Sequence, residues 1–328
     1  MNSPFAPSAS RPGHGTIDVK LFPPAVPVLS AFSYTYPLKL ISPTPNAGAK
    51  ALLIFLLTYG GGLVAGDRID LSVTIAASAR LALVTQGSTK IFKAPNPEIV
   101  SKQSLQVRIK SDGALLYLPD PVQPFKESVY EQRQTFTVDS YKGSLCVLDW
   151  VSEGRTARQE KWNLWQWKGK NEVWSLGEID GGEAHRRLLL RDNIVLDGLP
   201  STQFSSSLEQ RMDGMGVFGT LIIRGPLFDS LASFFINEFA ALPRIGGRDW
   251  SSGADKRQLS SVEEKRYNRE QRGRDGALLW TAAALRGFVL VKFGAREVET
   301  ARRWLGSMLK EEKSVEAEFG EGSLLCLK

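Results

Sequence analysis

The chain has 328 residues, of which 42% are hydrophobic and 23% charged, and its formal net charge is +6 at pH 7. This composition is that of a soluble globular protein with a sizeable core, and the mixing of basic with acidic residues argues against nucleic-acid binding. The longest apolar run, Ala51–Leu57, is too short to span a membrane, and two cysteines and no N-terminal signal region favour a reducing, cytoplasmic location.

Short strands are expected over the first two thirds of the chain. Apolar or alternating runs bounded by Gly, Pro, Asp or Ser occur at 51–57, 68–75, 80–84, 105–109, 114–118, 135–138, 144–148 and 172–176. Further strands are expected at 186–191, 194–196, 217–224 and 287–293. This spacing is typical of a β-sandwich, a barrel or a solenoid, so the sequence predicts a mainly β fold with many stacked strands.

Two helices are expected towards the C-terminus. One follows Pro226 and carries its apolar stripe from Leu227 to Phe239, and the other runs from about Ala295 to Lys310. Between them, residues 246–276 hold eight basic and six acidic residues, which predicts a mobile polar insertion. We therefore expect a disordered leader over residues 1–15 and one β-rich domain over 16–328.

A glycine-rich block, Thr58–Asp67, separates the first two expected strands. It contains Gly60, Gly61, Gly62 and Gly66 and ends on Asp67. The spacing misses the dinucleotide fingerprint, and no Lys-Ser/Thr pair follows Gly66. The next residues alternate as a strand, so there is no helix N-terminus to hold a phosphate. A hairpin is the simple interpretation, and a shaped site is the alternative.

Catalytic motifs are scarce. The chain has two histidines, which rules out a zinc site with several His ligands, and no G-x-S-x-G elbow is present. A carboxylate pair of the glycosidase kind would need two of its many acids, and the sequence nominates none. The chain is therefore not expected to be an enzyme, although a β-rich carbohydrate hydrolase remains one alternative and a plain interaction module another.

Four ordered segments resemble those of the urease accessory protein family UreD, called UreH in some bacteria. They are residues 60–67, 85–92, 118–125 and 148–155, the last leading to Glu160, and residues 285–305 resemble the C-terminal strand and helix of that family. Two features depart from it. Gln159 precedes Glu160 where the family commonly has Gly, and the 246–276 insertion is long, which suggests a eukaryotic member.

The resemblance implies a non-catalytic scaffold for nickel insertion into urease. It implies binding to apo-urease and to UreF, and through UreF to the GTPase UreG, within a fold of helically stacked β-sheets. It also implies transient nickel in an internal tunnel, with no tightly bound cofactor. Sparse carboxylates suit such transit, because a closed set of His or Cys ligands would trap the ion.

The acids beside these motifs are the candidate nickel ligands. Asp67 and Glu160 are the first choices for a tunnel lining, and Asp120 and Asp149 are weaker ones. Each has a simpler interpretation as a turn cap or an ion-pair partner.

Other motif residues are expected to hold the architecture or to face a partner. The architectural set is Gln86, Lys90, Pro119, Gly154 and Arg155, together with the glycines of the Thr58–Asp67 block. Trp162 and Trp165 are candidate interface anchors, with core packing as the more frequent role of such residues.

Overall fold

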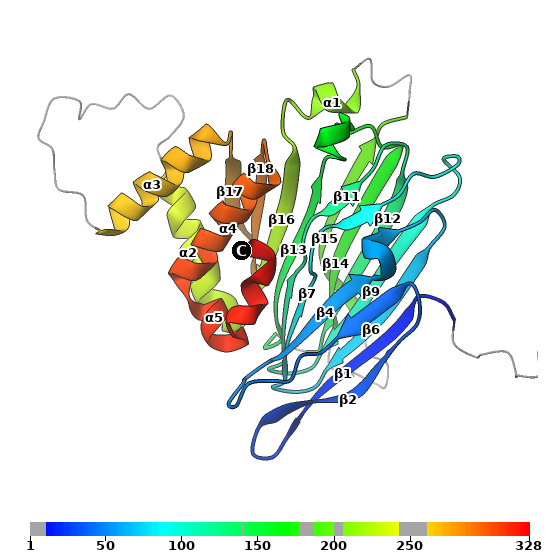
Figure 1. The fold of residues 1–328 in the computed structure, drawn as a ribbon. Coiled ribbons are helices and arrows are strands. Elements are labelled where there is room, and N and C mark those ends of the chain that lie inside the picture. Colours follow the sequence, from blue (N-terminus) through cyan, green and yellow to red (C-terminus); the bar gives the residue numbers. More distant parts are fainter. Residues whose placement is uncertain (1–10, 140, 177–185, 200–205, 243–260) are drawn as a thin grey trace, which may run out of the picture.

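The structure is a computed structural model that describes residues 11–139, 141–176, 186–199, 206–242 and 261–328. It is mainly β, as expected, and its long strands form two facing sheets with a group of helices packed beside one of them (Figure 1). The two sheets enclose one apolar core, and the helices and the outer face of one sheet enclose another.

The central part of the chain winds as a β-solenoid. Each turn gives one strand to each main sheet and a short strand to a third side, and all successive neighbours are parallel. The first sheet takes β6 (Arg68–Ile75), β9 (Ser101–Ile109), β12 (Val129–Val138) and β14 (Gln166–Leu176). The second takes β4 (Leu52–Thr58), β7 (Arg80–Val84), β10 (Ala114–Leu118) and β13 (Ser144–Ser152), and the third side takes β5 (Gly62–Leu63), β8 (Thr89–Ile91) and β11 (Val122–Pro124).

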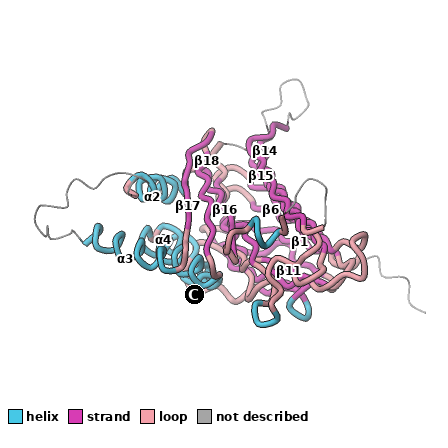
Figure 2. Tube along the Cα trace, turned by 90° about the horizontal axis from the view of Figure 1, so that it is seen from above, coloured by secondary structure: helices cyan, strands magenta, loops and turns pink. Residues whose placement is uncertain are grey.

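Strands at the two ends of the chain extend these sheets. The first sheet runs from β2 (Val26–Tyr34) and β1 (His14–Phe22) to β15 (Arg186–Asp197) at its far edge. The second runs from β3 (Leu38–Ile41) to β16 (Val217–Arg224), β18 (Phe288–Ala295) and the edge strand β17 (Leu279–Leu285). Figure 2 shows β15, the late edge of the first sheet, opposite β16 and β18 of the second sheet.

Alternation of side chains explains the solenoid. In the first sheet, Val73, Val107, Phe136 and Val173 stand side by side in register and are buried. Their outward neighbours are more exposed, as a strand with one buried face requires. Strand β13 is buried on both faces, because the solenoid interior covers one and the helices cover the other.

The two helices expected towards the C-terminus have the expected amphipathic character. After a short turn at Pro226–Phe228, α2 (Asp229–Ala240) packs with α4 (Val298–Glu312) and α5 (Ser314–Phe319) on the second sheet. Aromatic rings fill this layer, with Trp280 5.2 Å from Trp304 and Phe235 6.3 Å from Trp304, centroid to centroid. A short helix, α1 (Leu208–Arg211), precedes β16, and a 3₁₀ segment, Glu321–Leu327, follows α5.

Several expectations about the elements are wrong in detail. Residues 261–275 of the polar insertion form a helix, α3 (Ser261–Asp275), whereas 246–260 lie outside the described residues. The segment was expected to be a loop because it is polar, but ion pairs attach it to the fold as a helix. Arg266 and Arg269 both donate to the buried carboxylate of Glu238 on α2. The expected strands 186–191 and 194–196 are one strand, β15. The strands that were not expected are β1, β2, β3, β5, β8, β11 and β17.

The expected leader is also too long. Strand β1 begins at His14 and pairs with β6 and β2, so residues 14 and 15 belong to the fold, and residues 1–10 lie outside the described part.

Candidate functional site

The glycine-rich block forms a corner of the solenoid. Strand β4 lies in the second sheet and β6 in the first, so the hairpin interpretation is wrong. Gly60, Gly61 and Gly66 have φ values of 72°, 72° and 87°, a region of backbone conformation that favours glycine. Gly62 pairs with Lys90, and a Cβ on it would lie 2.3 Å from the Lys90 carbonyl oxygen. The block therefore supplies a tight corner and a close backbone approach.

Asp67 closes this corner. Its Oδ2 accepts a hydrogen bond from the Val64 backbone N–H at 3.0 Å, and its own N–H donates to the Val64 carbonyl. The residue is half-buried and does not line the interior cavity described below. These contacts are those of a turn cap, and the role of Asp67 in a nickel path stays a prediction.

Glu160 is held by the Gly-Arg turn before it. Arg155 Nε donates to Glu160 Oε2 at 2.9 Å, and Arg155 lies over the ring of Phe125. The guanidinium holds the pKa of the Glu160 carboxyl below its usual value. A Cβ on Gly154 would lie 2.5 Å from the Glu160 carbonyl oxygen, so glycine is needed there. A paired carboxylate is a poor first ligand, and a metal role for Glu160 also stays a prediction.

The two weaker candidates, Asp120 and Asp149, meet at an enclosed cavity inside the solenoid. The cavity measures about 10 Å³, roughly the volume that one water occupies. Its walls are largely polar, and its other lining residues include Thr85, Gln103, Tyr117, Gln132 and Gln134. We call this group, with Asp120, Asp149 and the adjoining Asn171, the polar chamber.

Asp149 is the central acid of the polar chamber. It is 3% exposed, and its two oxygens accept hydrogen bonds from Gln132 Nε2 at 2.8 Å and Asn171 Nδ2 at 2.6 Å. Burial raises the pKa of the Asp149 carboxyl, and the two amide donors oppose that rise. No described cation forms an ion pair with Asp149 within 4.0 Å. A buried carboxylate with neutral partners is the kind of group that attracts a cation.

Asp120 stands at the rim of the polar chamber and is fully engaged. Its Oδ2 accepts from Thr85 Oγ1 and from the Gly87 N–H, and its Oδ1 accepts from Arg302 on α4 at 2.8 Å. The neighbouring Pro119 carbonyl accepts from Trp150 Nε1 at 2.8 Å. This network ties the helical layer to the solenoid, which is a structural role.

The remaining predicted residues divide between surface and core. Gln86 and Lys90 are exposed beside the glycine corner. Trp162 is buried, and its Nε1 donates to the Met215 carbonyl, so an interface role for it is wrong in this structure and core packing applies. Trp165 is half-buried, and its role at an interface stays a prediction.

Sequence reasoning missed the amides of the polar chamber. Gln103, Gln132, Gln134 and Asn171 are buried at inward positions of β9, β12 and β14, in phase with Leu105, Phe136 and Val173. These amides occupy positions of the strands where the alternation calls for an apolar residue, and that departure was the signal that could have identified them.

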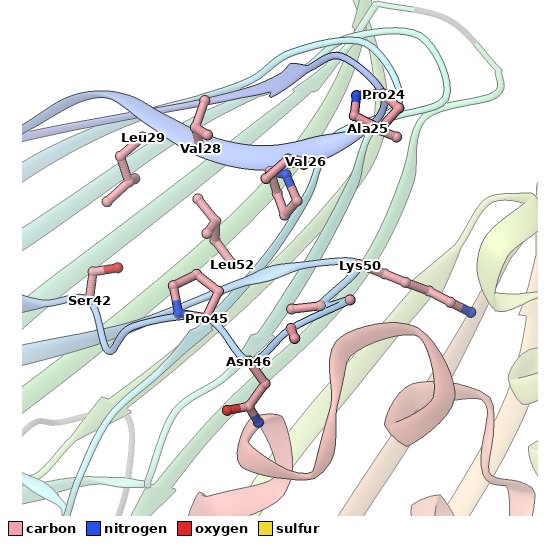
Figure 3. A pocket seen from close by; sticks show the side chains of 14 residues that line it. Pro24, Ala25, Val26, Val28, Leu29, Ser42, Pro45, Asn46, Lys50 and Leu52 are labelled. Carbon is pink, nitrogen blue, oxygen red and sulfur yellow. The ribbon is translucent and has the colours of Figure 1, made fainter.

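A larger hollow near the start of the chain has a mostly apolar lining. A cavity of about 680 Å³ lies between the start of β2 and the loop before β4 (Figure 3). Pro24, Val28, Leu29, Pro45 and Leu52 line it, and Lys50 is its one charged lining residue. Among the residues that the structure describes, no group of three or more His, Cys, Asp or Glu side chains is placed to hold a metal ion. Within the same ranges, no helix is long and apolar enough to cross a bilayer.

Comparisons with known proteins agree with the resemblance. Residues 14–319 match the family described as UreD urease accessory protein. A protein of Schizosaccharomyces pombe named "uncharacterized urease accessory protein ureD-like" is 31% identical over 82% of this chain and 84% of its own length. "Urease accessory protein 4" of Cryptococcus neoformans is 31% identical over 91% and 90%. "Urease accessory protein D" of Arabidopsis thaliana is 40% identical over 44% and 49%.

Proposed function

The chain belongs to the UreD family of urease accessory proteins, and on that premise we propose that its solenoid interior passes nickel towards urease. The family is one of maturation factors and not of catalysts, so the chain has a role in urease maturation and is not an enzyme. The finer proposal concerns how it acts: as a scaffold that binds apo-urease and UreF, and UreG through UreF.

The polar chamber is the observation that supports nickel transfer. A solenoid interior needs only apolar side chains for stability, yet this one encloses Asp149 among four amides. Carboxylate and amide oxygens bind a divalent ion more weakly than a set of thiolates or imidazoles does. Such oxygens suit an ion that must leave again. Because the cavity is small, a nickel ion would pass only if the surrounding side chains moved.

Asp149 is therefore the preferred nickel-path residue, ahead of Asp67 and Glu160. The test expresses urease with its accessory proteins and with this chain carrying Asp149→Asn. Urease activity and the nickel content of purified urease should both fall by about ten- to a hundredfold. Co-purification of urease, UreF and UreG with the chain should be unchanged, because Asp149 is buried away from any surface.

Asp112→Asn is the matched control, since Asp112 is an exposed acid in a turn of the same solenoid. It should leave activation intact. Normal nickel loading with Asp149→Asn would end the proposal for this residue. Asp67→Ala and Glu160→Ala, tested alongside, show whether the turn and ion-paired acids contribute to the same path.

Binding to apo-urease and to UreF can be tested separately from nickel transfer. If the chain binds apo-urease and UreF, both proteins should co-purify with it, and nickel content need not be measured. A chain that activates urease without retaining either protein would contradict the scaffold role.

A further inference from the structure

Polar side chains continue from the polar chamber to the side of the molecule. On the first sheet, Gln134, Asn171 and Asp192 stand in register on three adjacent strands, β12, β14 and β15. On the second sheet, Asp149, Thr220 and Lys292 do the same on β13, β16 and β18. Adjacent strands are about 4.8 Å apart, so each set is a continuous row. We call these six residues the polar lane.

The two rows of the polar lane touch each other across the solenoid. Asn171 Nδ2 donates to Asp149 at 2.6 Å at the inner end, and Lys292 Nζ donates to Asp192 Oδ1 at 2.8 Å at the outer end. Lys292 also lies 3.4 Å from Thr220 Oγ1. Its side chain is 48% exposed, whereas Asp149 is buried. The lane therefore leads from the enclosed acid to solvent at the seam between β15 and β18.

The lane contains more acceptors than donors. Gln134 and Asn171 are each 1% exposed, and the buried oxygens Gln134 Oε1, Asn171 Oδ1 and Asp192 Oδ2 accept no hydrogen bond from another group of the protein. Buried oxygens without donors are costly. Three of them in one row, beside a buried carboxylate, form a surface that a cation would satisfy. The charges of Asp192 and Lys292 also act on Asp149: Asp192 raises the pKa of the Asp149 carboxyl, which burial already raises, and Lys292 lowers it.

We infer that the polar lane is a lateral mouth of the nickel path, and that Lys292 closes it by occupying Asp192 with its own ammonium group. The inference rests on the proposed function and adds a route and a gate to it. With Lys292 in place, the outer carboxylate is neutralised and a divalent cation gains little by entering. When a partner draws Lys292 away, Asp192 and the unpartnered oxygens become available to the ion, which then meets Asp149.

Nickel chloride binding to the purified full chain tests this directly. Lys292→Met keeps the length of the alkyl chain and removes the charge. In equilibrium dialysis it should bind about one equivalent of nickel roughly tenfold more tightly than the wild type does, a gain in binding free energy of about 1.4 kcal/mol. Lys292→Met combined with Asp192→Asn should return binding to the wild-type level. Lys168→Met, on the exposed face of β14, is the matched control and should change nothing.

A Lys292→Met protein that binds nickel no better than the wild type or the control would overturn the inference, as would a gain that survives Asp192→Asn. Circular dichroism checks the fold, and Lys292→Gln, which still donates to Asp192, serves if the Met variant unfolds. The Lys292→Gln variant should show a smaller gain in nickel affinity than is expected of Lys292→Met. Failure here is separable from failure of the proposed function. If Asp149→Asn stops nickel loading of urease while Lys292→Met leaves nickel binding unchanged, the chamber functions without this mouth.

Discussion

Two neighbouring levels of the solenoid interior are built on the same strands and differ in chemistry. One level consists of Val73, Val107, Phe136 and Val173 and is wholly apolar. The second level lies two residues earlier along each strand and consists of Leu71, Leu105, Gln134 and Asn171. Register and strand geometry are shared. The fold therefore accommodates either kind of side chain, and it does not itself demand the polar ones.

The two levels differ in what they contribute to stability and to function. The apolar level is stabilised by burial of its side chains. The polar level leaves Gln134 Oε1 and Asn171 Oδ1 without partners, which lowers stability. A region that is less stable than its neighbour on the same scaffold is expected to serve binding or transfer. Mutations at the two levels should therefore have opposite effects on stability.

Phe136→Ala should produce the largest effect. The ring is fully buried between the two sheets, and its removal leaves a cavity that the stacked strands cannot close. We expect a loss of about 3–5 kcal/mol in the free energy of unfolding, measured by urea denaturation. Phe136→Leu should lose much less. If the alanine variant were as stable as the wild type, the apolar level would not be the stabilising one.

Sequence reasoning predicted this apolar level well and the polar one poorly. Alternation in residues 105–109 and 135–138 correctly identified strands, since one face of each is buried. The observed strands begin earlier, and the same alternation continued backwards puts Gln103 and Gln134 at inward positions, where propensity gives no reason to expect a buried amide. Asp149 was found only because it lies in a family-like motif. Its contacts with Gln132 and Asn171 join residues 17 and 22 positions away.

Sequence reasoning also missed two elements, α3 and β17, that are held in place by long-range contacts. Helix α3 has no apolar stripe, so its periodicity predicts a loop, and its attachment depends on Glu238, a residue 28 positions before Arg266. Strand β17 was missed because Leu279–Leu285 is short and rich in alanine. Pairing with β18 and packing of Trp280 on the helices place it in the sheet. Such long-range contacts cannot be found from local pattern.

Asp149→Asn should have a moderate and pH-dependent effect on stability. Burial raises the pKa of this carboxyl in the folded state. The carboxyl therefore contributes fully to stability below the ordinary pKa of Asp, and this contribution is lost as the pH rises through the pKa of the folded state. Asparagine cannot ionise, and Asn171 can turn its amide to present Oδ1 to it. The variant should be roughly 0.5–2 kcal/mol more stable than the wild type at pH 7, with the difference vanishing near pH 4.

Urea denaturation at a series of pH values measures this effect. A variant that is less stable than the wild type at neutral pH would show that Asp149 is a structural residue, and loss of urease activation would then need no nickel path. The Asp112→Asn control, at an exposed acid, should show no such pH dependence.

Gln134→Leu should have the smallest effect and gives the most direct comparison of the two levels. It extends the Leu71–Leu105 row by one strand and removes a buried oxygen that has no donor, so the free energy of unfolding should rise by about 1 kcal/mol. Urease activation should fall, because one oxygen of the polar lane is lost. Val107→Leu, an apolar change at the neighbouring level, is the control for altered packing and should leave activation unchanged. A Gln134→Leu protein that is less stable would mean that the amide supports the fold. One that is more stable and activates urease fully would mean that the polar level contributes to neither stability nor transfer at this position.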